Sequence, residues 1–184
     1  MHKFLLILLL TFFGGKSDNA SKEDNSSTNQ QELTVNAQQG MLIGEYDRKQ
    51  LEEEPYASWY KPTYEAYTPN EEALETIKEN ISDYDITVLM GTWCHDSKRE
   101  TPKLLKLLDL SNYDMDKLTL IGVDYRRNTP DNAREKYDVL RVPTIIFYKN
   151  GKEVNRFVEH AKQSLEEDIA KIVAGKEYSN SYAK

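Results

Sequence analysis

The chain has 184 residues, enough for one domain with additional segments but short for two full domains. It contains 24 Lys and Arg residues and 31 Asp and Glu residues, so the formal net charge is −7. This balance argues against nucleic acid as the main partner, because phosphate binding needs a basic surface. The single cysteine, Cys94, cannot form an intramolecular disulfide, which excludes a disulfide-stapled scaffold.

The first residues have the pattern of an export signal. Lys3 precedes an apolar run over residues 4–13, which is too short to span a bilayer as a helix but suits a signal peptide. Cleavage after Ser17 would place small residues at the specificity positions, so we expect residues 1–17 to be a signal peptide. A buried helix is the alternative. The mature chain is then exported, without a transmembrane helix, to the periplasm or cell envelope. The leader has no cysteine, so a lipid anchor is not supported.

Two segments precede the expected domain. Residues 18–40 are rich in polar and charged side chains and cannot bury enough apolar surface to offset the entropy of ordering, which predicts a disordered polar tether. Residues 41–69 carry many aromatic side chains broken by prolines, so only short helices are expected there. We expect this aromatic-rich helical extension to pack on the following domain, and a ligand groove lined by its aromatics is the alternative.

The rest of the chain alternates between helical and strand periodicity. The expected elements are helix 70–81, strand 86–90, helix 98–110, strand 118–124, helix 131–137, strand 144–148, strand 154–158 and helix 164–173. Asn150-Gly151 predicts a hairpin between the last two strands. Pro102 should bend its helix or mark a start later than Ser97. This order predicts a three-layer α/β domain with a mixed central sheet over residues 70–176, followed by a flexible tail at 177–184.

The chemistry is expected where the strand ending at Gly91 turns into the next helix. Cys94 lies in this turn, where unpaired N–H groups and the positive end of the helix favour thiolate over thiol. The thiolate is the nucleophile in thiol–disulfide exchange, so the position suits that reaction. The alternative is a small buried hydrophobe.

Two motifs carry a family resemblance: Trp93-Cys94-His95-Asp96-Ser97 at the strand-to-helix turn, and Arg141-Val142-Pro143-Thr144 ahead of the hairpin and closing helix. In this order they resemble the thioredoxin superfamily. The chain is similar to bacterial exported thioredoxin-like proteins with a Trp-Cys-x-Asp-Ser motif and an aromatic extension such as residues 59–64. The resemblance implies a thioredoxin-like fold and a cis peptide bond before Pro143, which faces Cys94. It also implies that the Val142 backbone pairs with substrate, and that Trp93, Pro143 and Thr144 complete the substrate site.

Departures from the family pattern shape the expected mechanism. Ser97 stands where dithiol members have a second cysteine, so nothing in the chain can resolve a mixed disulfide, although Ser97 can donate a hydrogen bond to the thiolate. Val88 replaces the buried acid that many members carry below the cysteine. His95 and Asp96 are expected to tune the ionisation of Cys94: a protonated His95 favours the thiolate, and Asp96 opposes it unless it caps the helix.

These features predict a monothiol thiol–disulfide oxidoreductase or isomerase that contributes to redox homeostasis outside the cytoplasm. Its expected partners are client proteins or low-molecular-weight thiols that contain thiols or disulfides, and an external thiol reductant. We expect no cofactor and no metal, because one cysteine and separated histidines fall short of a closed zinc site. The alternative is a non-catalytic thioredoxin-fold protein that binds peptides or retains partners as mixed disulfides.

Overall fold

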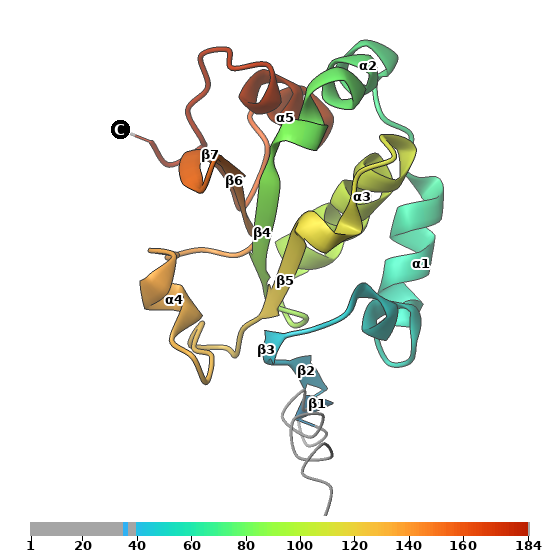
Figure 1. Cartoon of the computed structure of the whole chain (residues 1–184). Coiled ribbons are helices and arrows are strands. Elements are labelled where there is room, and N and C mark those ends of the chain that lie inside the picture. Colours follow the sequence, from blue (N-terminus) through green and yellow to red (C-terminus); the bar gives the residue numbers. More distant parts are fainter. Residues whose placement is uncertain (1–34, 37–39, 184) are drawn as a thin grey trace, which may run out of the picture. The chain divides into compact units, whose positions relative to one another are not determined.

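The computed structural model describes residues 35–36 and 40–183, so the expected signal peptide and most of the expected tether lie outside the described residues. A five-stranded sheet with the order β3-β5-β4-β6-β7 forms its centre (Figure 1). The strands are β1 (Val35–Asn36), β2 (Met41–Leu42), β3 (Gly44–Glu45), β4 (Asp85–Met90), β5 (Leu118–Gly122), β6 (Thr144–Lys149) and β7 (Lys152–Val158). The α-helices are α1 (Ala57–Ala66), α2 (Glu71–Asn80), α3 (His95–Leu110), α4 (Ala133–Lys136) and α5 (Leu165–Val173). The 3-10 helices are η1 (Arg48–Glu52), η2 (Ile81–Asp83) and η3 (Met115–Lys117).

The sheet is mixed, as the sequence predicts. Strand β4 runs parallel to β5 and antiparallel to β6, and β6 and β7 form the expected hairpin. The hairpin turns at Asn150 (φ 54°) and Gly151 (φ 73°), both in the left-handed region that a two-residue hairpin turn of this kind requires. A strand that the sequence analysis did not predict, β3, pairs antiparallel with β5 at the sheet edge.

Side chains from β4 alternate between two apolar clusters, as the period of two in a strand requires. Ile86, Val88 and Met90 join the cluster that includes α2, α3 and α5. Leu89 joins the second cluster, to which α4 contributes Ala133. Figure 1 shows α4 on the opposite side of the sheet from α1 and α3, which gives the predicted three-layer α/β arrangement.

The extension packs on the domain through aromatic side chains and one ion pair. Tyr56 and Tyr60 are buried in the same cluster as the leucines of α3. Arg48 donates two hydrogen bonds to Asp109 near the end of α3, at 2.7 and 2.9 Å, and the Tyr64 hydroxyl donates to the same carboxylate at 2.6 Å. The aromatic-rich segment is therefore part of the folded body.

Helix α3 begins earlier than its proline suggests. The prediction of a start later than Ser97 is wrong, because α3 starts at His95 and keeps Pro102 inside. Proline removes its own N–H from the helical ladder and crowds the carbonyl one turn earlier, but the leucines of this helix are buried, and their packing offsets that cost. The early start makes Cys94 the residue that precedes the first helical turn.

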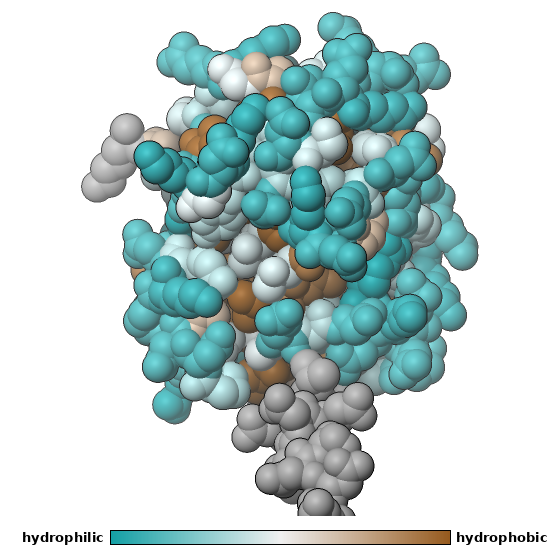
Figure 2. All heavy atoms as spheres, in the orientation of Figure 1, coloured by the Kyte–Doolittle hydropathy of each residue, from teal (hydrophilic) through white to brown (hydrophobic). Residues whose placement is uncertain are grey.

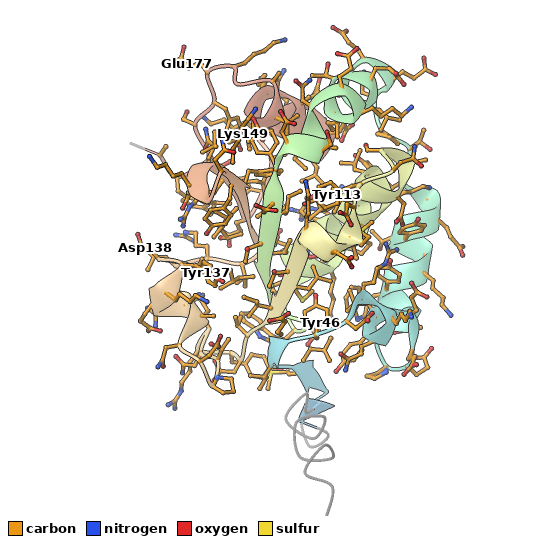
Figure 3. All side chains as sticks on the ribbon, viewed as in Figure 1. Tyr46, Tyr113, Tyr137, Asp138, Lys149 and Glu177 are labelled. Carbon is orange, nitrogen blue, oxygen red and sulfur yellow. The ribbon has the colours of Figure 1, made fainter. Side chains whose placement is uncertain are left out.

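The segment after α5 runs back along the domain, although the sequence predicts a flexible tail there. Its Tyr178 carbonyl accepts a hydrogen bond from Asn155 of β7, and Lys162 donates to Ser179. Figure 3 labels Glu177, an early residue of this segment, at the end of the domain away from α4.

Polar side chains cover most of the face drawn in Figure 2, with hydrophobic residues visible in its middle and lower parts. This agrees with a mean hydropathy of −0.72. Within residues 35–36 and 40–183, no helix combines the length and apolarity that a membrane crossing requires.

Candidate functional site

Cys94 occupies the junction between β4 and α3. Its N–H donates to the Gly91 carbonyl at 2.9 Å, and its own carbonyl accepts from Lys98 N at 3.0 Å, the first bond of the helical ladder. The N–H groups of His95, Asp96 and Ser97 have no hydrogen-bond partner among the described residues. Free donors at the positive end of a long helix favour an anion at Cys94.

The cis-proline turn lies directly opposite this cysteine. The peptide bond between Val142 and Pro143 is cis, as the resemblance implies. The half-buried Cys94 thiol donates to the Val142 carbonyl at 3.3 Å, so Cys94, Val142 and Pro143 come together as expected.

Thr144 directly follows the cis-proline turn. Its side chain is 1% exposed, and its hydroxyl donates to the Arg141 carbonyl at 2.7 Å. The Thr144 hydroxyl therefore supports the turn from inside, and the contact of Thr144 with substrate stays a prediction.

Ser97 also has another partner than the expected one. It is fully buried, and its Oγ accepts a hydrogen bond from Gly91 N at 3.2 Å. The hydrogen bonds among the described residues include none from Ser97 to the Cys94 sulfur. Ser97 thus closes the turn that carries Cys94, and its expected direct contact with the sulfur is absent from the described residues because the hydroxyl faces the end of β4.

The charges around Cys94 are largely balanced. His95 is exposed, and Asp96 forms an ion pair with Arg99 at 2.7 Å. Arg99 also contacts the buried Glu100 at 2.5 Å. The pairing with Arg99 weakens the opposition of Asp96 to a nearby anion. The sequence analysis missed Arg99, although its i, i+3 spacing from Asp96 is a signal for such a pair.

Trp93 is fixed beside the cysteine. Its indole N–H donates to the Val123 carbonyl at 3.0 Å, and its ring lies 5.1 Å from that of Tyr125. A Cβ at Gly91 would lie 2.6 Å from the indole ring, so this position needs glycine. Tyr125 is a site residue that sequence reasoning missed, because only the fold brings the loop after β5 to Trp93.

The segment that leads into the cis-proline turn is tied to β7. Arg156 donates to the carbonyls of Tyr137 and Asp138 at 3.1 and 3.0 Å. Figure 3 labels both residues at α4, below the hairpin. Val142 and Cys94 belong to the apolar cluster that α4 covers, so this attachment supports the site.

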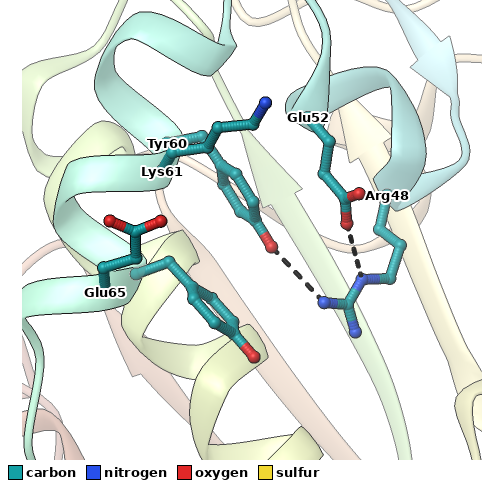
Figure 4. Close-up of a pocket in the computed structure, with 6 residues that line it drawn as sticks. Arg48, Glu52, Tyr60, Lys61 and Glu65 are labelled. Atoms are coloured by element: carbon teal, nitrogen blue, oxygen red, sulfur yellow. Dashed lines mark hydrogen bonds and ion pairs between the residues drawn. The ribbon is translucent and has the colours of Figure 1, made fainter.

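A separate hollow of about 260 Å³ lies between η1 and α1 (Figure 4). Arg48 dominates it, but this guanidinium already contacts Asp109, Tyr60 and Glu52. Its lining includes no residue of the Cys94 turn or the cis-proline turn. Among the described residues, no group of three or more His, Cys, Asp or Glu is placed to hold a metal ion.

A mixed sheet, a cysteine at the start of a helix and a facing cis-proline turn define an α/β protein of the thioredoxin-like class. The Thioredoxin family model matches residues 69–171, and the chain belongs to this family. Both the extension and the tail after α5 fall outside the matched range.

The chain is similar to several individual proteins. Thioredoxin of Staphylococcus epidermidis is 32% identical over 104 residues, which cover 52% of this chain and 95% of that protein. Thioredoxin H2 of Arabidopsis thaliana is 32% identical over 84 residues, covering 46% of this chain and only 59% of that protein. Among solved structures, thioredoxin of Fasciola hepatica has 25% identity and a TM-score of 0.37, with 56% of this chain and 89% of that chain covered.

Proposed function

We propose that this protein exchanges thiols and disulfides through Cys94 alone, acting on client proteins or small thiols outside the cytoplasm. The observation that carries the proposal is the position of the Cys94 sulfur. The sulfur lies at the N-terminal end of α3, where the N–H groups are free, and it is 3.3 Å from the Val142 carbonyl oxygen. Membership of the Thioredoxin family supports redox chemistry at this position.

The reaction is a pair of balanced exchanges. The Cys94 thiolate attacks one sulfur of a client disulfide, which forms a bond between Cys94 and the client and breaks the original bond. The released client thiolate takes a proton from water. An external thiolate then attacks the client sulfur of the mixed disulfide, forming a disulfide with the client and releasing Cys94 as the thiolate.

The Val142 backbone supplies the binding edge. No hydrogen bond among the described residues uses its N–H. An extended client segment beside Cys94 can therefore accept from this N–H, as in strand addition. In the free protein the Cys94 thiol donates a hydrogen bond to the Val142 carbonyl. When the thiol ionises it can no longer donate, so the carbonyl becomes free to accept a hydrogen bond from the client.

The chain holds a single cysteine, which favours a second candidate function, the retention of partners as long-lived mixed disulfides. The two functions differ only in the rate of the second exchange. The variant Ser97→Cys provides the comparison with dithiol chemistry. Its second thiol would lie one helical turn from Cys94 and could resolve the mixed disulfide within the chain.

The test mixes the purified mature protein with a disulfide-linked peptide and follows the masses of the products. We expect an adduct at Cys94 that an added thiol releases, no adduct with Cys94→Ala, and faster release with Ser97→Cys. Iodoacetamide at pH 7 should label Cys94 faster than a free peptide thiol. Equal labelling together with no adduct would refute the proposal, whereas an adduct that added thiol does not release would favour retention.

Export is proposed on the leader pattern of residues 1–17. The mature protein recovered from a native cell envelope should begin at Asp18. A protein that keeps Met1 and stays with the cytoplasmic fraction would refute this part of the proposal.

A further inference from the structure

The tail after α5 is anchored along the domain before it reaches the site. The Tyr178 hydroxyl contacts the carboxylate of Asp168 at 3.3 Å, and Asp168 is fully buried on α5. Ser181 then donates to the His160 carbonyl at 2.8 Å. These contacts direct the end of the described chain toward the cis-proline turn.

Tyr182 lies against that turn. The Arg141 guanidinium is 4.0 Å from the centre of the Tyr182 ring, a cation–π contact with the residue that precedes Val142. The Tyr182 hydroxyl donates to Glu159, and Glu159 pairs with Arg141 at 3.2 Å. The N–H of Glu159 also donates to the Pro143 carbonyl at 2.7 Å. One tyrosine is thus tied to both sides of the turn.

Electrostatics agree with this placement. The hydrogen bond to Glu159 is the main cause that raises the pKa of Tyr182, and the negative charge of Asp96 in the first turn of α3 also raises it. The same hydrogen bond keeps the Tyr182 ring beside the cis-proline turn, because Glu159 also pairs with Arg141.

Three exposed hydrophobic residues contact residues of this site or lie next to them in the chain. Among the described residues, the large hydrophobic side chains that remain exposed are Leu110, Tyr125, Leu140, Val154 and Tyr182. The Tyr125 ring (59% exposed) contacts that of Trp93 in a tilted arrangement, Leu140 (67%) is two residues from Val142 in the chain, and Tyr182 (40%) lies on Arg141. Exposed apolar side chains gathered beside a reactive group mark a recognition surface.

We infer that Tyr182 is a specificity-determining residue, which with Tyr125 and Leu140 selects extended protein segments that carry an aromatic residue next to the reactive disulfide. This inference rests on the proposed function of Cys94. Tyr182 belongs to the tail, outside the range that matches the family, so this selectivity is an addition of this chain to the thioredoxin-like domain. Aromatic pairs contribute beyond the area that they bury, so an aromatic client residue gains most from this surface.

The experiment measures the rate of adduct formation at Cys94 with three disulfides: oxidised glutathione, a peptide dimer with Phe beside its cysteine, and the same peptide with Ser. The wild-type chain should prefer the Phe peptide over the Ser peptide. Tyr182→Ala should lower that preference by about twofold to twelvefold, the range of one aromatic contact. Tyr182→Phe keeps the ring and should restore most of the preference. Glu177→Ala, an exposed change in the same tail, is the matched control.

The outcomes are distinguishable. A wild-type chain that reacts with none of the three disulfides overturns the proposed function and this inference with it. A wild-type chain that reacts but shows no preference for Phe overturns the inference alone. The inference alone is also overturned if Tyr182→Ala keeps the wild-type preference, or if it slows the reactions with all three disulfides by the same factor.

Discussion

Replacing Asp109 with Asn tests the attachment of the extension to α3. Asp109 accepts two hydrogen bonds from Arg48 and one from the Tyr64 hydroxyl, at 2.7, 2.9 and 2.6 Å. The amide keeps the shape of the side chain but removes the charge and offers only one acceptor oxygen. Arg48 is then left without its counter-charge.

The expected cost follows from the burial of this pair. The Arg48 and Asp109 side chains are 22% and 31% exposed, so the pair lies between the buried and surface limits. A hydrogen bond to a charged group contributes about 1.5–3 kcal/mol, and an exposed ion pair contributes less than about 1 kcal/mol. We therefore expect Asp109→Asn to lower the free energy of unfolding by about 2 kcal/mol, or Tm by about 6 °C.

The cost should depend on pH. Burial raises the pKa of Asp109, but the hydrogen bonds from Arg48 and Tyr64 outweigh it and hold the pKa below its ordinary value of 3.8. A carboxyl group with a depressed pKa stabilises the fold above its ordinary value, and this contribution is lost as pH falls through the folded pKa. The advantage of the wild type should thus be full at pH 7 and shrink from about pH 4 downward.

Urea unfolding followed by circular dichroism at pH 7 and at low pH measures both effects. Asp116→Asn is the control, because Asp116 is exposed and its carboxylate has no hydrogen-bond or ion-pair partner among the described residues. The reasoning fails if Asp109→Asn and the control are equally stable at pH 7. It also fails if the difference between Asp109→Asn and the wild type does not diminish in acid.

Three further predictions concern the site and the sheet. Gly122→Ala should destabilise the fold by about 3 kcal/mol in urea unfolding, because its Cβ would lie 2.2 Å from the Leu42 carbonyl oxygen. Trp93→Phe removes the hydrogen bond to Val123 and should cost about 1 kcal/mol in the same assay. Arg156→Leu frees α4 from β7, so hydrogen exchange should accelerate across residues 133–139 while α5 stays protected.

Each of these has a contrary outcome. A Gly122→Ala protein as stable as wild type would show that β2 and β5 do not approach as closely as described. If Trp93→Phe is as stable as the wild type, the hydrogen bond from the indole N–H does not stabilise the turn. Uniform acceleration of exchange in Arg156→Leu, with α5 included, would indicate global destabilisation rather than release of α4.

The sequence predicts the core of the fold because its main elements have strong periodicity and clear ends. Asn70 and Ser164 cap the N-termini of their helices, because their side chains accept hydrogen bonds from Ala73 N and Glu167 N. Such capping residues can be recognised in a sequence. Strand β3 escapes prediction because it has two residues and its pairing with β5 is set by the fold.

At the site, the strand-to-helix turn predicts the place of Cys94, and the family resemblance implies the cis-proline turn, but neither predicts every contact. The pattern places Ser97 one turn from Cys94, yet cannot show that its hydroxyl bonds to Gly91 instead. Tyr125 and Tyr182 reach the site only through long-range packing, for which local periodicity holds no signal.

Strand β3 has a practical consequence for work with this protein. A fragment cut to the family range, residues 69–171, would lack β3 and leave the outer edge of β5 without its partner. Unpaired edges recruit strands from other molecules, so such a fragment should self-associate more readily than the longer chain. The smallest portion worth expressing therefore starts before Gly44.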